Sequence, residues 1–180
     1  MNISYKTFTS FAKEDAELRS YLSWWAYQTT QERRMLDRTP EFFYENLVFA
    51  VFAFDEEELV GAAGLIYPLD KDGGKITWQN KIIIELGSNF VLPKYREMHI
   101  AKTFTLIRLD FVQGKDFFPI SVTGNIAMQK VFEGIAKPVE DLGEELQSLK
   151  GLIRDCNCQE NEKPLCKVCP LADKVVWVFH

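Results

Sequence analysis

The amino-acid sequence predicts an α+β fold, in which helices flank a mixed, mostly antiparallel central sheet of about six or seven strands. Short apolar runs of strand length alternate along the chain with longer segments of helical periodicity. The charged turn Asp55–Glu58 separates two of these runs and favours an antiparallel hairpin. A length of 180 residues, with 47% hydrophobic and 26% charged residues, is typical of one globular domain, here predicted over residues 1–180.

The first half of the chain has two predicted helices before the hairpin. Ser10 is a suitable N-cap for an amphipathic helix, because acidic residues follow it and apolar residues recur at helical spacing. Thr39 precedes Pro40, and proline is favoured in the first turn of a helix. The expected elements are a strand over Ile3–Thr9, a helix over 11–28, a short helix from Pro40 to about Asn46, and strands over Leu47–Phe54 and Leu59–Tyr67.

The second half begins with a polar loop over Leu69–Gln79, which contains the pair Gly73-Gly74. A long strand, a turn and a helix follow, and then a further strand and helix. Their predicted bounds are Lys81–Leu92, Glu97–Val112, Phe117–Val122 and about Ile126–Ile135. An acidic, cysteine-containing insert over residues 138–173 precedes the last strand, Lys174–His180.

Composition and charge argue against several classes of function. The net charge of −5 argues against nucleic-acid binding through a basic surface, and it suits a cationic substrate such as an amine. The longest apolar run, Leu47–Phe54, is far shorter than the roughly 20 residues that span a bilayer, so no membrane association is expected. The N-terminal segment lacks the basic and apolar regions of a secretion signal, which predicts a cytoplasmic protein. The sequence leaves a homodimer open.

The segment Ile82–Ala101 predicts a binding site for an anion. A β-rich run ends at Val91-Leu92-Pro93, and a short turn leads into a helix. The first N–H groups of a helix have no acceptor within it, and they lie at the positive end of the helix dipole. Together they form a site for a phosphate group. Lys94, Arg96 and Lys102 would add positive charge nearby.

The pattern V-x-P-x-Y-R-x-x-H-x-A in this segment resembles the pyrophosphate loop of the GNAT superfamily of N-acetyltransferases, usually written Q/R-x-x-G-x-G/A. His99 stands where that family normally has glycine, and Ala101 is the accepted alternative at the last position. We expect His99 to be tolerated, because residues at a helix N-terminus have ordinary negative φ angles. The resemblance covers about Leu47–Lys137, and the order of the elements agrees with it. It implies acetyl-CoA as the co-substrate.

The resemblance also implies which residues contact acetyl-CoA. Val91 ends the strand along which the pantetheine arm would bind, and an N–H near Val91–Leu92 would polarise the thioester carbonyl. Backbone N–H groups of about Met98–Ala101 would hold the pyrophosphate. The residues predicted to bind the cofactor are Phe90, Val91, Leu92, Arg96, Glu97, Met98, His99, Ile100, Ala101, Lys102 and Asn125.

Glu85 is the predicted catalytic base. It lies six residues before Val91, where many GNAT proteins have a strand carboxylate that deprotonates the amine. A single Glu among Ile and Leu residues is unusual, because burial of an unpaired carboxylate is costly and would raise its pKa toward the range of a base. The alternative is a strand residue that faces solvent or pairs with a lysine.

The segment Asn125–Ile135 resembles a second GNAT pattern, N-x-x-A-x-x-L-Y-x-x-x-G-F. Asn125 stands where the family's Asn bonds the pantetheine arm, and it is also a good N-cap. Phe132 replaces the family's Tyr, which protonates the departing thiolate, and phenylalanine cannot donate a proton. The predicted function is transfer of an acetyl group from acetyl-CoA to a primary amine of a small molecule or peptide. The alternative is a catalytically impaired acyl-CoA-binding or regulatory module with a zinc-stabilised interaction insert.

All four cysteines fall in the insert, in the pattern C-x-C-x7-C-x2-C. Four thiolates at short spacing can close a tetrahedral zinc site, and a reducing cytoplasm disfavours disulfides. We predict structural zinc on Cys156, Cys158, Cys166 and Cys169, with an iron–sulfur cluster and free or redox-active thiols as the alternatives. Four protein ligands leave no open position, so a catalytic zinc is not expected.

Overall fold

The computed structural model describes residues 2–32, 35, 38–68, 74–123, 125–138 and 175–179. Within these residues, seven strands follow the order β1-β2-β3-β5-β6-β8-β7, and an eighth, β4, pairs with β5. The β5–β6 pair is parallel, whereas β1–β2, β2–β3, β4–β5, β6–β8 and β7–β8 are antiparallel. This confirms the predicted α+β class and mixed sheet.

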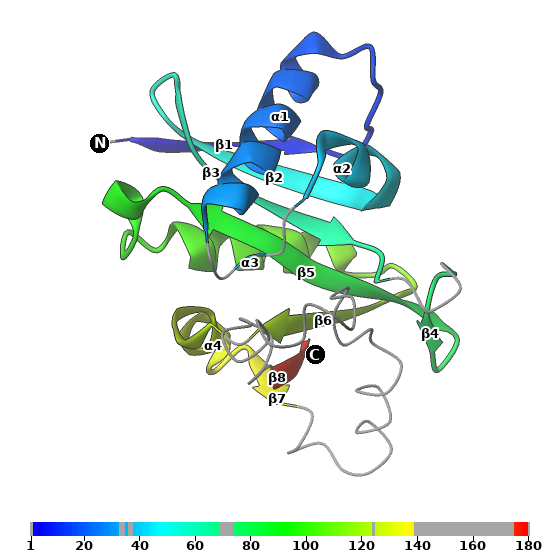
Figure 1. The fold of residues 1–180 in the computed structure, drawn as a ribbon. Coiled ribbons are helices and arrows are strands. Elements are labelled where there is room, and N and C mark those ends of the chain that lie inside the picture. The colour runs from blue at the N-terminus through cyan, green and yellow to red at the C-terminus, as the bar shows by residue number, and fades with distance from the viewer. Residues whose placement is uncertain are drawn as a thin grey trace, which may run out of the picture. The chain divides into compact units, whose positions relative to one another are not determined.

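The elements of Figure 1 are β1 (Ile3–Phe8), α1 (Ala16–Gln31), α2 (Pro40–Asn46), β2 (Leu47–Asp55), β3 (Glu58–Ile66), β4 (Thr77–Trp78), β5 (Lys81–Val91), η1 (Pro93–Tyr95), α3 (Ile100–Val112), β6 (Phe117–Thr123), α4 (Ile126–Phe132), β7 (Ala136–Pro138) and β8 (Val175–Phe179).

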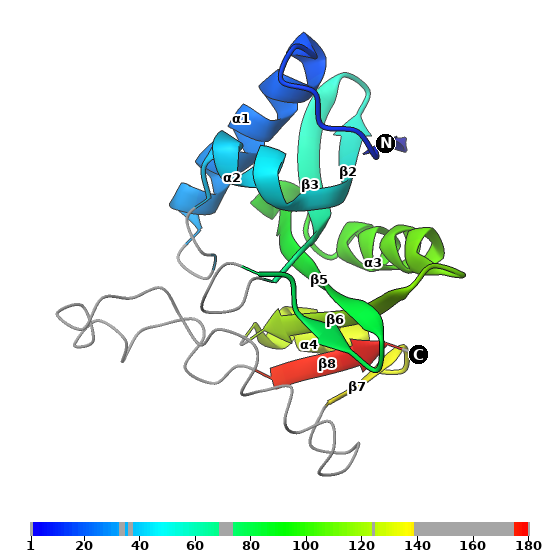
Figure 2. The ribbon, with the colours of Figure 1, turned by 90° about the vertical axis from the view of Figure 1, so that its right-hand side faces the viewer.

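The chain divides into two compact units. The first contains Met1–Ile66 and Leu86–Gly114, and the second contains Tyr67–Glu85 and Lys115–His180. In the first unit, β1, β2 and β3 form an antiparallel meander, in which Ala50 is opposite both Phe8 and Gly64. Helices α1 and α2 cover one face of these strands, and α3 covers the other (Figure 1 and Figure 2).

An aromatic core lies between β2–β3 and the two helices α1 and α2. The ring of Trp25 stacks on that of Phe43, with the ring centroids 4.1 Å apart and 13° between the planes. Both side chains are fully buried. A Cβ on Gly64 would lie 2.5 Å from a methyl group of Leu47 and 2.9 Å from the ring of Trp25. The absence of a side chain at Gly64 therefore allows α1 to pack closely on the second half of β3.

Helix α1 begins later than the sequence predicts. Its N-cap is Asp15 and not Ser10, because the Asp15 carboxylate accepts a hydrogen bond from the N–H of Leu18 at 2.9 Å. Both residue types are good N-caps, so local preference alone does not choose between them. Phe11 is partly buried against the core of the first unit. That contact is made from the connection between β1 and α1, which the sequence had assigned to the helix.

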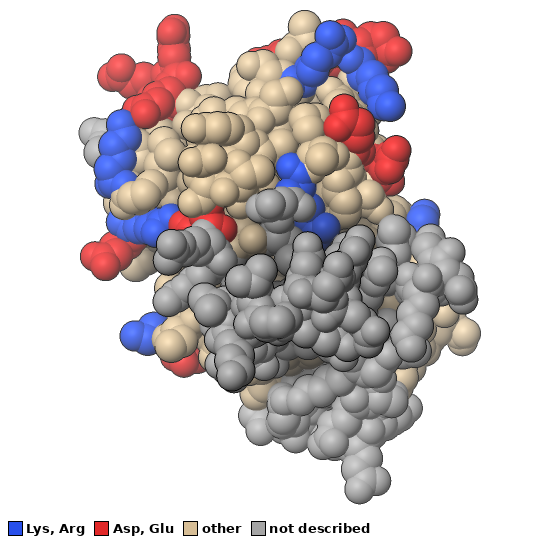
Figure 3. Space-filling model, in the orientation of Figure 1, with Lys and Arg blue, Asp and Glu red and all other residues tan. Residues whose placement is uncertain are grey.

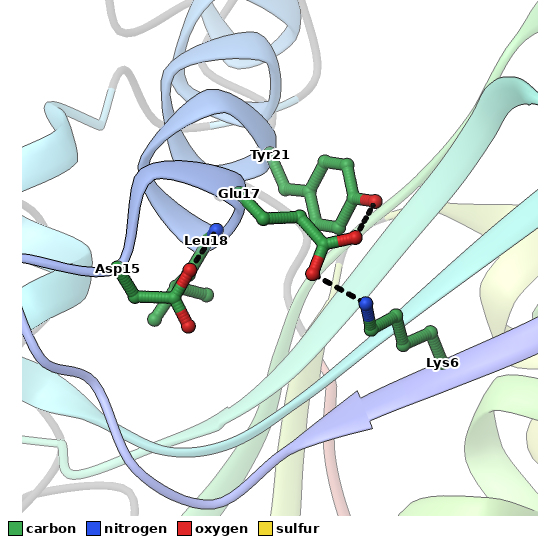
Figure 4. A network of polar contacts seen from close by, with 5 residues as sticks. All are labelled: Lys6, Asp15, Glu17, Leu18 and Tyr21. Carbon is green, nitrogen blue, oxygen red and sulfur yellow. Dashed lines mark hydrogen bonds and ion pairs between the residues drawn. The ribbon is translucent and has the colours of Figure 1, made fainter.

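A polar network joins the first turns of α1 to β1 (Figure 4). The ammonium group of Lys6 pairs with the carboxylate of Glu17, which also accepts a hydrogen bond from the hydroxyl of Tyr21 at 2.7 Å. Burial and the bond to Glu17 raise the pKa of Tyr21 to about 12. The network therefore orients the first turns of α1 relative to the edge strand of this unit.

The second unit is built on the parallel pairing of β5 with β6, in which Ile82 is opposite Phe117. Strand β8 pairs with β6, and β7 pairs with β8. Its apolar core contains Ile76, Ile83, Ile120, Val176 and Val178. The sequence predicts a loop over the residues of β4 and no strand over the residues of β7. These strands have two and three residues, which is too short for a period of two to be recognised.

The remaining predicted elements agree well with the structure. Elements β1, α2, β2, β3, β5, β6 and β8 begin and end within one residue of their predicted bounds. Helix α3 begins at Ile100 and not at Glu97, because two residues of the preceding loop have left-handed backbone angles. Helix α4 ends at Phe132, and Gly134, with a φ of 84°, turns the chain toward β7.

Candidate functional site

The last part of β5 has an irregular backbone. Ser88 has a φ of 50°, which is in the left-handed region and unusual within a strand. Two side chains hold the carbonyl groups beside this irregularity. The indole Nε1 of Trp25 donates to the carbonyl of Ser88 at 2.9 Å, and Nη1 of Arg108 donates to the carbonyl of Gly87 at 3.3 Å. Side chains from α1 and α3 thus fix the path of the strand toward Val91.

Arg108 is a residue that the sequence did not single out. Its side chain is fully buried in α3. Its Nη1 also donates to the carbonyl of Gly64 at 3.0 Å, and its Nε donates to the carbonyl of Phe104 at 3.1 Å. A buried guanidinium is tolerated when its N–H groups are hydrogen-bonded in this way. A single arginine four residues after Phe104, on the apolar side of a helix, was the signal that could have identified it.

The three residues at the end of β5 have different roles. The N–H of Leu92 donates to the carbonyl of Val60 at 2.9 Å, so it is not available to a ligand. The N–H groups alternate in direction along a strand, so the N–H of Val91 points away from β3. The side chain of Phe90 is 5% exposed and packs edge-on against Trp24, with the ring centroids 5.8 Å apart. Of this predicted segment, Val91 therefore has the best-oriented backbone donor.

Arg96 holds the loop after β5 in place. Its Nε donates to the carbonyl of Val91 at 3.1 Å, and its Nη2 pairs with the carboxylate of Glu32 at 2.6 Å. Glu32 is the C-cap residue of α1. Arg96 therefore connects the end of β5, the loop and the end of α1, and its charge is partly balanced by Glu32.

The loop begins at η1, which is anchored to the β2–β3 hairpin. The hydroxyl of Tyr95 lies 2.9 Å from the carboxylate of Glu58 and 3.1 Å from that of Asp55. Lys94 pairs with the same Glu58 carboxylate at 2.9 Å. Burial and the two carboxylates raise the pKa of Tyr95. The loop therefore starts from a point that is fixed on the hairpin.

Two residues of the loop, Glu97 and His99, have left-handed φ angles of 70° and 59°. The expectation that His99 has an ordinary negative φ is therefore wrong. His99 is the N-cap residue of α3, and its side chain makes no capping hydrogen bond. A left-handed residue lets the chain turn sharply into the helix, and glycine adopts this angle without steric cost. A glycine in place of His99 would therefore adopt this backbone angle without strain.

The N–H groups at the start of α3 are available to a ligand. The N–H of Thr103 donates to the carbonyl of His99 at 2.9 Å, which closes the first turn. In the part of the chain that the structure describes, the N–H groups of residues 97–102 have no hydrogen-bond acceptor. Residues 96–99 and Lys102 are exposed. Free donors and the positive end of the helix dipole coincide here, which is the arrangement that binds phosphate groups.

Glu85, the predicted base, lies in the part of β5 that belongs to the second unit. It is half-buried, and it is opposite Ile120 in the parallel pairing with β6. This pairing ends at Glu85. The role of Glu85 as a base stays a prediction.

The segment that resembles the second GNAT pattern forms the start and the body of α4. The side chain of Asn125 accepts a hydrogen bond from the N–H of Ala127 at 2.9 Å, which confirms its predicted use as an N-cap. Phe132 is fully buried. Its ring lies edge-on to Phe179 at 5.2 Å and is tilted against Trp177 at 5.8 Å. The position of the family's acid thus belongs to an aromatic cluster of the second unit.

The predicted zinc ligands Cys156, Cys158, Cys166 and Cys169 lie outside the described residues. Among the residues that are described, no group of three or more His, Cys, Asp or Glu side chains could hold a metal ion. No helix in the described ranges is long and apolar enough to cross a membrane. Acidic and basic side chains are interspersed over the coloured part of the face shown in Figure 3.

Comparison with known proteins identifies the fold. No protein-family model and no curated protein sequence matches the chain. An acetyltransferase of the GNAT family from Staphylococcus aureus Mu50 superposes with a TM-score of 0.57 at 14% identity, over 99% of this chain and 98% of that one. Arabidopsis thaliana NAA60, in complex with a bisubstrate analogue, gives a TM-score of 0.56 at 12% identity, over 99% and 97% of the two chains. The chain has the GNAT fold.

A third match is to part of a larger enzyme. N-acetylglutamate synthase from Neisseria gonorrhoeae, complexed with coenzyme A and N-acetyl-glutamate, gives a TM-score of 0.57 at 10% identity. The match covers 98% of this chain and 35% of that one. At these identities the matches establish the GNAT fold alone. These matches confirm the fold that was expected because the segment Ile82–Ala101 resembles the GNAT pyrophosphate loop.

Proposed function

We propose that this GNAT-fold protein is an acetyl-CoA-dependent N-acetyltransferase that acetylates a primary amine of a small molecule or peptide. The supporting observation is the row of acceptor-free N–H groups at residues 97–102, which includes the start of α3. A diphosphate carries the negative charge and the acceptor oxygens that free N–H groups at a helix N-terminus bind. The exposed Lys102 adds a cation beside it.

The proposed reaction forms a C–N bond and breaks a C–S bond. The neutral amine attacks the carbonyl carbon of the thioester, and the tetrahedral intermediate collapses with the electron pair on sulfur. Glu85 accepts the proton that the substrate ammonium must lose before attack. The N–H of Val91 donates to the carbonyl oxygen as negative charge develops there. Water protonates the departing thiolate, because Phe132 has no proton to give.

Titration calorimetry with acetyl-CoA tests the binding part of this proposal. We expect saturable binding that coenzyme A competes for, because the diphosphate contacts are common to both molecules. An absence of heat at millimolar acetyl-CoA would overturn the proposal. Release of free thiol in the presence of a panel of amines and short peptides then tests transfer and identifies the acceptor class.

Substitution of the predicted base tests the chemical step. Glu85→Gln is expected to lower kcat by about 10²-fold, since a positioned base contributes on that order, while the Kd of acetyl-CoA stays unchanged. The difference in kcat between Glu85→Gln and the wild type is expected to shrink at high pH, because the amine is then already neutral in solution. Glu14→Gln is the matched control, since Glu14 is exposed on the connection between β1 and α1. Equal kcat values for Glu85→Gln and the wild type would remove Glu85 from the mechanism.

A catalytically impaired acyl-CoA-binding module is the second candidate. It is favoured by one observation, the complete burial of Phe132 at the position of the family's acid. This candidate predicts acetyl-CoA binding without release of thiol above the background rate for any amine tested. The zinc-stabilised insert of this candidate is tested by metal analysis of the purified protein before and after Cys166→Ser. Cytoplasmic location and a homodimer stay predictions.

A further inference from the structure

Asn89 carries a buried donor near the end of β5. Its Nδ2 atom is buried, and no hydrogen-bond acceptor for it lies among the described residues. A buried donor without an acceptor destabilises the folded state, and such groups are rare in native proteins. Asn46 shows the usual arrangement, because its buried Nδ2 donates to the carbonyl of Phe42 at 2.8 Å. Asn89 therefore requires an explanation that Asn46 does not.

The backbone on both sides of Asn89 is fixed by side chains. Trp25 donates to the carbonyl of the preceding residue, Ser88, at 2.9 Å. Arg96 donates to the carbonyl of Val91 at 3.1 Å, two residues further on. These bonds hold the segment without help from a ligand. The amide of Asn89 is therefore a donor on a rigid support, which is the property of a preorganised binding group.

The strand geometry places Asn89 beside the proposed thioester position. Side chains alternate between the faces of a strand, so Asn89 and Val91 share the face opposite to Phe90. Two residues of a strand span roughly 6.6 to 6.8 Å. The Cα atoms of Asn89 and Val91 are therefore about this far apart, and both residues belong to the segment along which the pantetheine arm is proposed to bind.

We propose that the side-chain amide of Asn89 binds acetyl-CoA, by donating to a carbonyl oxygen in its acyl–pantetheine part. This inference rests on the proposed function and adds a side-chain contact to it. The thioester and the amide groups of this part of the ligand carry carbonyl oxygens, which are the acceptors that an unpaired amide donor needs. A bound carbonyl would satisfy the donor that the protein itself leaves unpaired.

Asn89→Leu and the matched control Asn46→Leu test the inference, because leucine has nearly the shape of asparagine but no donor. We expect Asn46→Leu to lower the melting temperature by about 3–8 °C, since it removes a bonded amide. Asn89→Leu is expected to leave the melting temperature of the free protein unchanged or to raise it by about 2–4 °C. The Kd of acetyl-CoA is expected to weaken about 5–10-fold in Asn89→Leu and to stay at the wild-type value in Asn46→Leu.

Asn89→Ala repeats the measurement without the bulk of leucine, and titrations with coenzyme A and acetyl-CoA locate the acceptor. A loss of affinity for acetyl-CoA alone identifies the thioester oxygen, and an equal loss for both identifies an amide oxygen of the pantetheine arm. The inference is overturned if both Asn89 variants bind acetyl-CoA as the wild type does, or if both melt as low as Asn46→Leu. If the wild type itself does not bind acetyl-CoA, the proposed function fails and the inference fails with it.

Discussion

The two segments that resemble GNAT motifs use their polar groups differently. Before and at the start of α3, the N–H groups of residues 97–102 have no acceptor within the described structure, and residues 96–99 and Lys102 are exposed. At the start of α4, the side-chain oxygen of Asn125 is bound to its own helix, and Phe132 is packed in an aromatic cluster. The first segment is open to a ligand, whereas much of the second serves the fold.

This difference bears separately on the proposed binding of acetyl-CoA and on the proposed transfer. A phosphate site made of backbone N–H groups depends on the path of the chain, so it can form with His99 in place of a glycine when the path is the same. Protonation of a thiolate by the protein depends on one side chain, and Phe132 cannot supply the proton. The chain is therefore expected to bind acetyl-CoA even if its rate of transfer is low.

The largest predicted effect concerns the second segment. Phe132→Ala is expected to lower the free energy of unfolding by about 3–5 kcal/mol, because it opens a cavity beside Trp177 and Phe179. Urea unfolding measures the change. Phe132→Tyr is expected to lower it by about 1–3 kcal/mol, because the position is fully buried. An increase in the rate of transfer in Phe132→Tyr, at unchanged stability, would show that the position is open to the ligand. It would contradict the view that the second segment serves the fold.

The next effect concerns the first segment. Ala101→Glu places a carboxylate in the first turn of α3, and it is expected to weaken acetyl-CoA binding by about 100-fold, or about 2.7 kcal/mol, through repulsion of the diphosphate. Calorimetry measures the Kd. The free protein should not lose stability, because a negative charge is favourable at a helix N-terminus. Ala16→Glu, in the first turn of α1, is the matched control and should leave binding unchanged. Wild-type affinity in Ala101→Glu would place the diphosphate elsewhere.

A smaller effect is expected from the left-handed residue of the loop. His99→Gly should raise the free energy of unfolding by about 1 kcal/mol, because glycine has no steric penalty at a φ of 59°. Leu106→Gly, on the exposed side of α3, should lower it by about the same amount, since glycine is a poor helix former. Thermal and urea unfolding of both variants test the difference. A loss of stability in His99→Gly would show that the imidazole makes a favourable contact.

The smallest effect is a dependence on pH at the anchor of the loop. The pKa of Tyr95 is raised above its ordinary value of 10, so the folded state favours the neutral phenol over the phenolate. Its contribution to stability is therefore present below pH 10 and is lost as the pH rises through the raised pKa. The difference in unfolding free energy between the wild type and Tyr95→Phe should narrow above pH 10. A constant difference up to about pH 12 would show that the hydroxyl does not stabilise the anchor.

Local sequence patterns predicted much of the fold and part of the candidate site. Thr39 and Pro40 mark the start of α2, and the apolar runs mark β2, β3 and β5 to within one residue. Asn125 was predicted as an N-cap and is one. Ser10 and Asp15 are equally good caps by type, and the packing of Phe11 against the core accompanies the later start. Short strands such as β4 have too few residues to show a period.

The sequence by itself determined the order of strands and helices and the place at which a strand leads into a helix N-terminus, because those features depend on neighbours along the chain. The tertiary structure alone decided which donors are used. It bonded the N–H of Leu92 to Val60, buried Arg108 among carbonyl groups and left the amide of Asn89 without an acceptor among the described residues. A hydrogen bond joins atoms that are close in space, whereas Leu92 and Val60, like Arg108 and Gly64, are tens of residues apart in the chain. Such pairs cannot be recognised from neighbouring residues in the sequence.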